Sequence, residues 1–130
     1  MKLFRKDQKG QSLVEFALII PLLMIMLVGV FDVGRMLYTY TGMHFTAQET
    51  VRLGGFGYPD DEIISFAKDN FRTGDGELLE VNVSPDSGER KPGEYVTVTL
   101  DYSITPFTPF AKYVFSDSIQ MSADSTIRIE

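Results

Sequence analysis

The feature that most constrains this chain is an uncharged apolar run from Phe16 to Phe31 (FALIIPLLMIMLVGVF). Extended back to Leu13, the run has 19 residues. As a helix these reach roughly 28 Å, close to the ~30 Å thickness of the hydrocarbon layer of a bilayer. A soluble domain within 130 residues is too small to surround such a helix on every side. The run therefore predicts a membrane span.

The charges on either side of the run predict its orientation. Residues 1–10 carry four basic side chains and one acidic one, whereas residues 32–130 carry 16 acidic and 8 basic side chains. Because Lys and Arg are enriched on the cytoplasmic side, we expect a cytoplasmic leader at residues 1–10 and a span at residues 11–31 in the cytoplasmic membrane. The acidic remainder then lies outside the cytoplasm, and its charge argues against nucleic-acid binding.

A cleaved secretory signal is the alternative reading of the same run, since a basic start followed by an apolar segment fits one. Such a signal ends in a small-x-small cleavage site. The sequence after the run reads GVFDVGRMLY, with bulky or charged residues at the required positions. We therefore favour an anchor that stays in the membrane.

Beyond the span, apolar residues recur at helical spacing, with nothing to break a helix before Gly54 and Gly55. We expect one helix from about Ser12 to Leu53, with an amphipathic continuation over residues 32–55. Its expected apolar stripe consists of Val33, Leu37, Tyr40, His44, Ala47 and Val51, widened by Met36, Met43 and Thr50.

Two residues of this helix have alternative interpretations. Pro21 cannot donate a hydrogen bond to the carbonyl of Ala17, so we expect a kink or a loosened turn, although membrane helices also tolerate proline without one. His44 lies on the apolar stripe, where a packed imidazole is favoured over a metal ligand or a catalytic base.

The remaining residues, 56–130, predict a small α+β head. Pro59 and the three acidic residues after it predict the start of a short helix. Alternating apolar residues then predict three strands of an antiparallel sheet, near residues 78–84, 95–104 and 119–129. Since so small a head is marginal alone, the long helix should pack on the sheet.

Composition also limits the chemistry. The chain has no cysteine and a single histidine, which excludes thiol nucleophiles, thiolate metal sites and two-histidine metal sites. The acidic groups near residues 60–62 and 75–77 lack the spacing of a calcium loop. With no paired-acid motif or cofactor loop, we predict no enzyme, no metal site and no cofactor.

The segment from Thr105 to Phe115 combines two prolines with four aromatic rings. It is either an exposed docking loop for a neighbouring protein or a loop folded over the open end of the sheet, and we favour the second interpretation.

Three motifs follow the basic tip. They are Gly10-Gln11-Ser12 with Val14-Glu15-Phe16, the Ile20-Pro21-Leu22-Leu23 of the span, and an acidic residue, a spacer, then Gly34-Arg35. Through these motifs the run from Gly10 to Gly55 resembles the TadE-like family of minor pilins, or pseudopilins, of the Tad (tight adherence) pilus. A long helix lying on a small sheet is also the plan of a pilin.

The resemblance implies a pilus assembly protein that a prepilin peptidase cuts between Gly10 and Gln11. It also implies, as partners, the major Tad pilin, other minor pilins, the inner-membrane assembly platform and membrane lipid. Glu15 would then pair with the new amino terminus, in its own chain or in a neighbouring pilin; otherwise it is a carboxylate in interfacial water. The rival is an uncleaved single-pass protein whose head binds an envelope partner.

Overall fold

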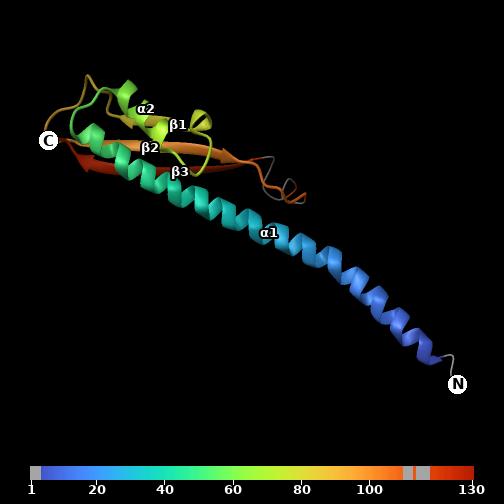
Figure 1. Cartoon of the computed structure of the whole chain (residues 1–130). Coiled ribbons are helices and arrows are strands. Elements are labelled where there is room, and N and C mark those ends of the chain that lie inside the picture. The colour runs from blue at the N-terminus through green and yellow to red at the C-terminus, as the bar shows by residue number, and fades with distance from the viewer. Residues whose placement is uncertain (1–3, 110–112, 114–117) are drawn as a thin grey trace.

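The computed structural model describes residues 4–109, 113 and 118–130. Over these residues the chain has the predicted α+β fold, with a long helix, a short helix and a three-stranded antiparallel sheet (Figure 1). The elements in chain order are α1 (Phe4–Gly55), α2 (Asp60–Asn70), the 3-10 helix η1 (Gly76–Leu78), β1 (Glu80–Ser84), β2 (Tyr95–Ile104) and β3 (Ile119–Arg128).

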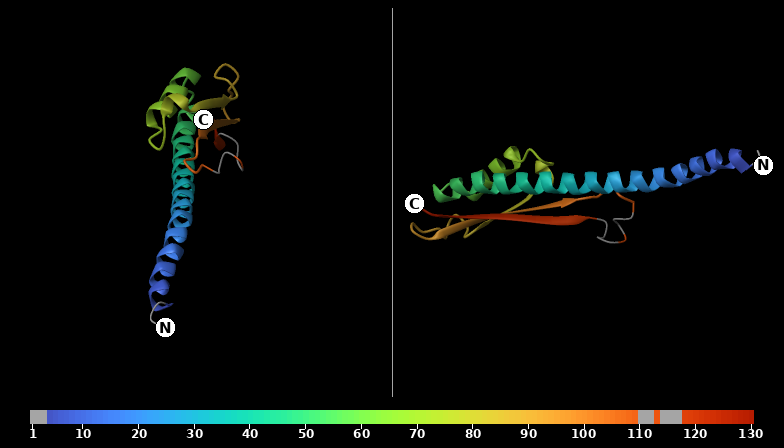
Figure 2. Two further views of the ribbon diagram at one scale, coloured as in Figure 1. Left: turned by 90° about the vertical axis from the view of Figure 1, so that its right-hand side faces the viewer. Right: turned by 90° about the horizontal axis from the view of Figure 1, so that it is seen from below.

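Helix α1 has 52 residues, about 80 Å at ~1.5 Å per residue. It begins at Phe4 instead of about Ser12, because the residues before Ser12 include no proline and Gly10 costs a helix interior only about 1 kcal/mol. Its N-terminal half projects beyond the sheet, and its C-terminal half lies along the sheet (Figures 1 and 2). The helix continues through Pro21 without interruption, and a kink there stays a prediction.

The projecting half of α1 has the character of a membrane span. Within the described residues, α1 is the one helix long and apolar enough to cross a bilayer, with a mean hydropathy of 2.7 over its most apolar window and none of that window buried. Side chains throughout residues 11–28 are exposed. Because an exposed apolar surface of this extent is unfavourable in water, the finding agrees with a single membrane anchor.

The three strands pair in the order β1-β2-β3, with both pairs antiparallel. Val81 lies opposite Leu100, and Leu100 lies opposite Ala123. The predicted alternation is confirmed, since Val96, Val98 and Leu100 are fully buried while their neighbours face outward. On the outer face, the hydroxyls of Thr97 and Thr126 are 2.8 Å apart.

Both helices cover the inner face of the sheet. Helix α1 packs on β2 and β3, and α2 packs on α1 and β1. The 3-10 helix η1 begins where the side chain of Asp75 accepts a hydrogen bond from the N–H of Glu77. The buried core draws on every layer: Met43, Ala47, Val51, Ile63, Ala67, Phe71, Leu79, Val83, Val96, Val98, Leu100, Ala123 and Ile129.

The predicted apolar stripe on α1 is wrong in its first half. Val33, Leu37 and Tyr40 are 52%, 61% and 41% exposed. The helix instead turns a partly polar face to the head: Asp32, Thr39, Met43, Thr46, Ala47, Thr50 and Val51 are buried. Thr39 and Thr46 can be buried here because each hydroxyl donates to a backbone carbonyl, as Thr46 Oγ1 does to the Gly42 carbonyl at 2.9 Å. The buried hydroxyl of Thr50 has no hydrogen-bond partner among the described residues.

One glycine of α1 allows the segment after α2 to approach closely. A Cβ atom on Gly42 would lie 2.0 Å from Thr73 Oγ1. Beside it, Thr39 and Thr73 exchange hydrogen bonds, each hydroxyl donating to the other's carbonyl, at 3.2 and 3.4 Å. Glycine at position 42 therefore leaves the room that the segment needs to pack closely on α1.

Candidate functional site

The predicted processing site lies on the exposed, N-terminal part of α1. Gly10 and Gln11 are exposed, and both are helical. The side-chain amide of Gln11 donates a hydrogen bond to Glu15 Oε1 at 3.1 Å, and Ser12 Oγ donates to the Gln8 carbonyl at 2.9 Å. Phe16 is 62% exposed. Gln11 and Glu15 therefore face each other across one turn of the helix.

A second constellation lies where the apolar run ends. Asp32 is only 4% exposed, although it is the first acidic residue after the run. Its Oδ1 accepts the backbone N–H of Phe107 at 3.0 Å, and its Oδ2 accepts the backbone N–H of Thr108 at 2.8 Å. The Thr108 hydroxyl also donates to Oδ2. Three donors of one loop therefore converge on one carboxylate.

Arg35 holds the same loop from the next turn of α1. Its Nη2 donates to the carbonyl of Thr105, and its guanidinium carbon lies 4.3 Å from the centre of the Phe107 ring, a cation-π contact. The Phe107 ring also lies 6.2 Å from that of Phe31. We call Asp32 and Arg35, with residues 105–108, the helix–loop clamp.

The ionisation of Asp32 reflects these contacts. Burial raises the pKa of this carboxyl, whereas hydrogen bonds from Thr108 and Phe107 and the charge of Arg35 lower it. The net effect is a pKa below the usual value for aspartate. The clamp therefore holds a carboxylate that is ionised at neutral pH.

The structure places the predicted site residues in two groups. Gln11, Ser12, Glu15 and Phe16 lie on the exposed part of α1, and Arg35 lies in the helix–loop clamp. Sequence reasoning found Arg35 through its motif but missed the partners of Asp32, which are 75 and 76 residues away in the chain.

Gly34 has a different environment from Arg35. A Cβ atom on Gly34 would meet no other atom within 4 Å. The packing of this chain therefore does not require glycine at position 34, although the position belongs to the motif.

The loop from Thr105 to Phe115, predicted either to be an exposed docking loop or to fold over the sheet, is described only over residues 105–109 and 113. Residues 105–108 lie against α1, with Pro106 buried and Phe107 63% exposed, whereas Tyr113 is 88% exposed. The remaining residues up to Phe115, 110–112 and 114–115, lie outside the described residues. Residues 105–108 therefore dock on their own chain, mainly through the backbone, while the side chains of Phe107 and Tyr113 are exposed.

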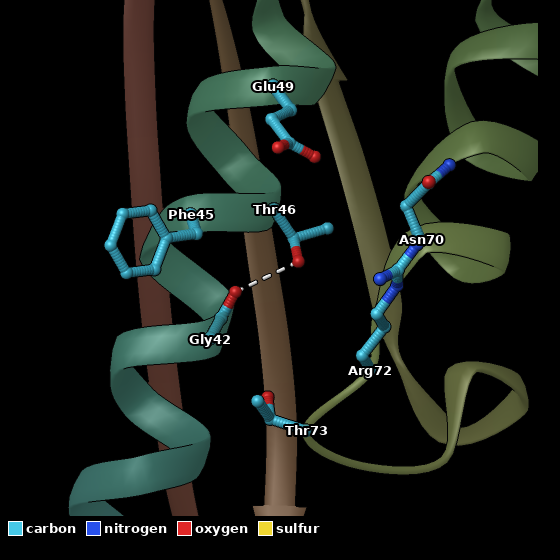
Figure 3. A pocket seen from close by; sticks show the side chains of 7 residues that line it. All are labelled: Gly42, Phe45, Thr46, Glu49, Asn70, Arg72 and Thr73. Atoms are coloured by element: carbon cyan, nitrogen blue, oxygen red, sulfur yellow. Dashed lines mark hydrogen bonds between the residues drawn. The ribbon is translucent and has the colours of Figure 1, made fainter.

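A hollow of about 360 Å³ lies between α1 and the segment that follows α2 (Figure 3). Its charged side chains, Glu49 and Arg72, come from opposite walls. The Thr46 hydroxyl points toward the Gly42 carbonyl, to which it is bonded, and not into the hollow as a nucleophile. The lining residues are Gly42, Phe45, Thr46, Glu49, Asn70, Arg72 and Thr73, and they form no recognisable catalytic arrangement.

Other polar groups have structural partners. The ring of His44 packs edge-to-face on Tyr40 at 4.5 Å, as expected for a packed imidazole. Asp60 forms an ion pair with Arg90, whose side chain is 4% exposed and whose pKa is lowered by burial. Over the part of the chain that the structure describes, no group of three His, Asp or Glu side chains could hold a metal ion.

Comparison with known proteins gives one match. The family model described as TadE-like protein matches residues 10–52, which confirms the resemblance seen in the sequence. No curated protein and no solved structure matches the chain significantly. The matched segment contains Gly10, Gln11, Glu15, Asp32 and Arg35, so it includes both the predicted processing motif and the helical half of the clamp.

Proposed function

Because residues 10–52 are a TadE-like segment, which is typical of membrane proteins associated with the Tad pilus, we propose that this chain is a minor pilin, or pseudopilin, that takes part in assembly of the pilus. The observation that carries the proposal is the form of α1. One continuous helix has an uncovered apolar half and a second half that forms the core of a small head. A pilin needs both parts: an apolar helix that anchors it in the membrane and a folded head that lies outside the membrane.

In this proposal residues 1–10 are a cytoplasmic leader, and a prepilin peptidase cuts the bond between Gly10 and Gln11. The basic leader keeps that bond on the cytoplasmic side. Gly10 favours the cut because the protease needs an extended segment, and glycine leaves the helical state more easily than other residues except proline. The helix that starts at Gln11 keeps the anchor, with the head outside the cytoplasm.

The contact between Gln11 and Glu15 supports a role for the carboxylate. Cleavage would convert the backbone nitrogen of Gln11 into an ammonium group, four residues before Glu15 on the same helix. An isolated carboxylate costs up to about 3 kcal/mol at a bilayer centre and less near its edge. The new amine, of this chain or of a neighbouring pilin, offsets that cost.

The partners of the mature protein follow from this assignment. They are the major Tad pilin, other minor pilins and the inner-membrane assembly platform, with lipid around residues 11–31. The exposed face of α1 at Val33, Leu37 and Tyr40 continues the exposed surface of the span, so it is available to helices of other subunits as they leave the membrane.

Site-specific photo-crosslinking tests the proposal. Leu18 is 72% exposed in the span, so a photoreactive residue there should capture the major pilin in cells that assemble pili. A strain without the major pilin is the control. If Leu18 captures no pilin and the chain keeps its leader, the protein is instead an uncleaved anchor whose head binds an envelope partner.

A further inference from the structure

We propose that the loop at residues 105–109 is a second membrane contact of this chain, in which the ring of Phe107 lies in the interfacial layer of the bilayer beside Phe31. The occupant of this surface is lipid, not a protein. The inference rests on the span assigned to residues 11–31, and it goes beyond the proposed role in pilus assembly.

The first argument is the level of the loop along α1. Residues 11–31 reach about 30 Å as a helix, which places Phe31 at the edge of the hydrocarbon layer. The Phe107 ring lies 6.2 Å from the Phe31 ring, so both rings are at nearly the same depth. Figure 2 shows the segment that follows β2 beside α1, at the end of the sheet nearest the N-terminus.

The second argument is exposure. Phe31 and Phe107 are 62% and 63% exposed, and together they make an aromatic patch on a helix and a loop. Transfer of a phenylalanine side chain out of water is favourable. Aromatic side chains with a basic neighbour are typical of surfaces that lie in the lipid interface, and Arg35 is that neighbour.

The third argument is the satisfaction of the loop backbone. Pro106 and Pro109 have no N–H group, and the N–H groups of Phe107 and Thr108 both donate to Asp32. The carbonyl of Thr105 accepts from Arg35. Because unpaired backbone groups are costly near hydrocarbon, the pairing of these two N–H groups and of the Thr105 carbonyl lowers the cost of placing the loop in the interface. The helix–loop clamp thus positions the Phe107 ring and also supplies hydrogen-bond partners for the loop backbone.

Lipid is favoured over a protein as the occupant because the patch is continuous with the span. The bilayer surrounds Phe31 whenever the chain is anchored, and Phe107 contacts that ring directly. A protein partner would have to displace this lipid.

The test uses the absence of tryptophan from the chain. Phe107→Trp introduces a single fluorescent reporter into the full-length protein, reconstituted in phosphatidylcholine vesicles with and without bromine atoms near the upper end of the acyl chains. We expect blue-shifted emission that brominated lipid quenches. Phe31→Trp is the matched positive control, and Phe56→Trp, which is 66% exposed at the other end of α1, is the matched negative control.

The outcomes separate the proposals. Quenching of Phe31→Trp without quenching of Phe107→Trp overturns the second membrane contact and leaves the anchor intact. A blue-shifted but unquenched Phe107→Trp shows cover by protein and also overturns it. Failure to quench Phe31→Trp overturns the span itself, and with it the proposed pilin.

A second reporter guards against disturbance of the loop by the larger indole ring. Since the chain has no cysteine, Phe107→Cys can carry a single nitroxide label. Faster collision with lipid-soluble oxygen than with a water-soluble nickel chelate supports the contact, and the reverse order overturns it.

Discussion

Asp32 holds Thr108 twice, because its Oδ2 atom accepts both the backbone N–H of Thr108, at 2.8 Å, and the Thr108 hydroxyl. This relationship joins the end of the apolar run to the loop that follows β2. It fixes this end of the sheet to α1, one turn before Arg35 binds the same loop. The loop is therefore held on the helix from two successive turns of α1.

Asp32→Ala should release this loop. The change leaves the N–H groups of Phe107 and Thr108 without their acceptor, and unsatisfied buried donors cost about 1–3 kcal/mol each. We expect faster proteolysis within residues 105–109 and a lower unfolding midpoint in detergent. Asp124→Ala, at an exposed aspartate on β3, is the matched control. Equal proteolysis of the two variants would show that Asp32 does not hold the loop.

The same carboxylate predicts a direction of pH dependence. Because the pKa of Asp32 is lower in the folded protein than in the unfolded chain, its stabilisation is complete above the ordinary value of about 3.9 and is lost as the pH falls through the folded value. Unfolding of the wild type should therefore become easier in acid by more than unfolding of Asp32→Asn. Parallel pH profiles for the two proteins, measured by chemical denaturation, would contradict this.

Gly42→Ala should destabilise the head. The new Cβ atom would lie 2.0 Å from Thr73 Oγ1 and 2.6 Å from Thr73 Cβ, so the whole segment must shift. Overpacking of this kind costs about 1–3 kcal/mol. Gly34→Ala is the matched control, because its Cβ meets no atom within 4 Å and alanine favours a helix by about 1 kcal/mol. Thermal melts that rank Gly42→Ala as stable as Gly34→Ala would refute the close packing.

The strands could be predicted because each alternates between a buried and an exposed side chain, as Val96, Val98 and Leu100 show. The continuation of the helix could be predicted because no strong breaker lies between the end of the span and Gly54. The face of α1 that meets the head could not, because Thr39 and Thr46 are polar in sequence and are buried through hydrogen bonds visible only in the fold.

The candidate site also has one part that could be predicted from the sequence and one part that could not. Motifs local in the chain, Gly10 with Gln11 and Gly34 with Arg35, could be found in the sequence through the resemblance to the TadE-like family. The charge pattern of the sequence predicts that Asp32 begins the water-exposed region, whereas Asp32 is buried by a loop more than 70 residues away. A long-range partner of this kind leaves no periodic signal in the sequence.

Glu15→Val should insert and be processed normally, since neither step requires the carboxylate, but should abolish crosslinking to the major pilin and the formation of pili. Glu15→Gln should fail nearly as completely, because it keeps the shape of the side chain and loses its charge. Pilus counts and crosslink yields measure both effects. Normal piliation in both variants would leave Glu15 as a carboxylate in interfacial water.

The most direct test of the central claim is the intact mass of the protein extracted from membranes of a host with an active prepilin peptidase. For the wild type we predict a chain that begins at Gln11. For Gly10→Val we predict a chain that keeps its leader, because a β-branched residue restricts the backbone that the protease must bind. A wild-type protein that retains residues 1–10 in such a host would contradict its assignment as a processed pilin.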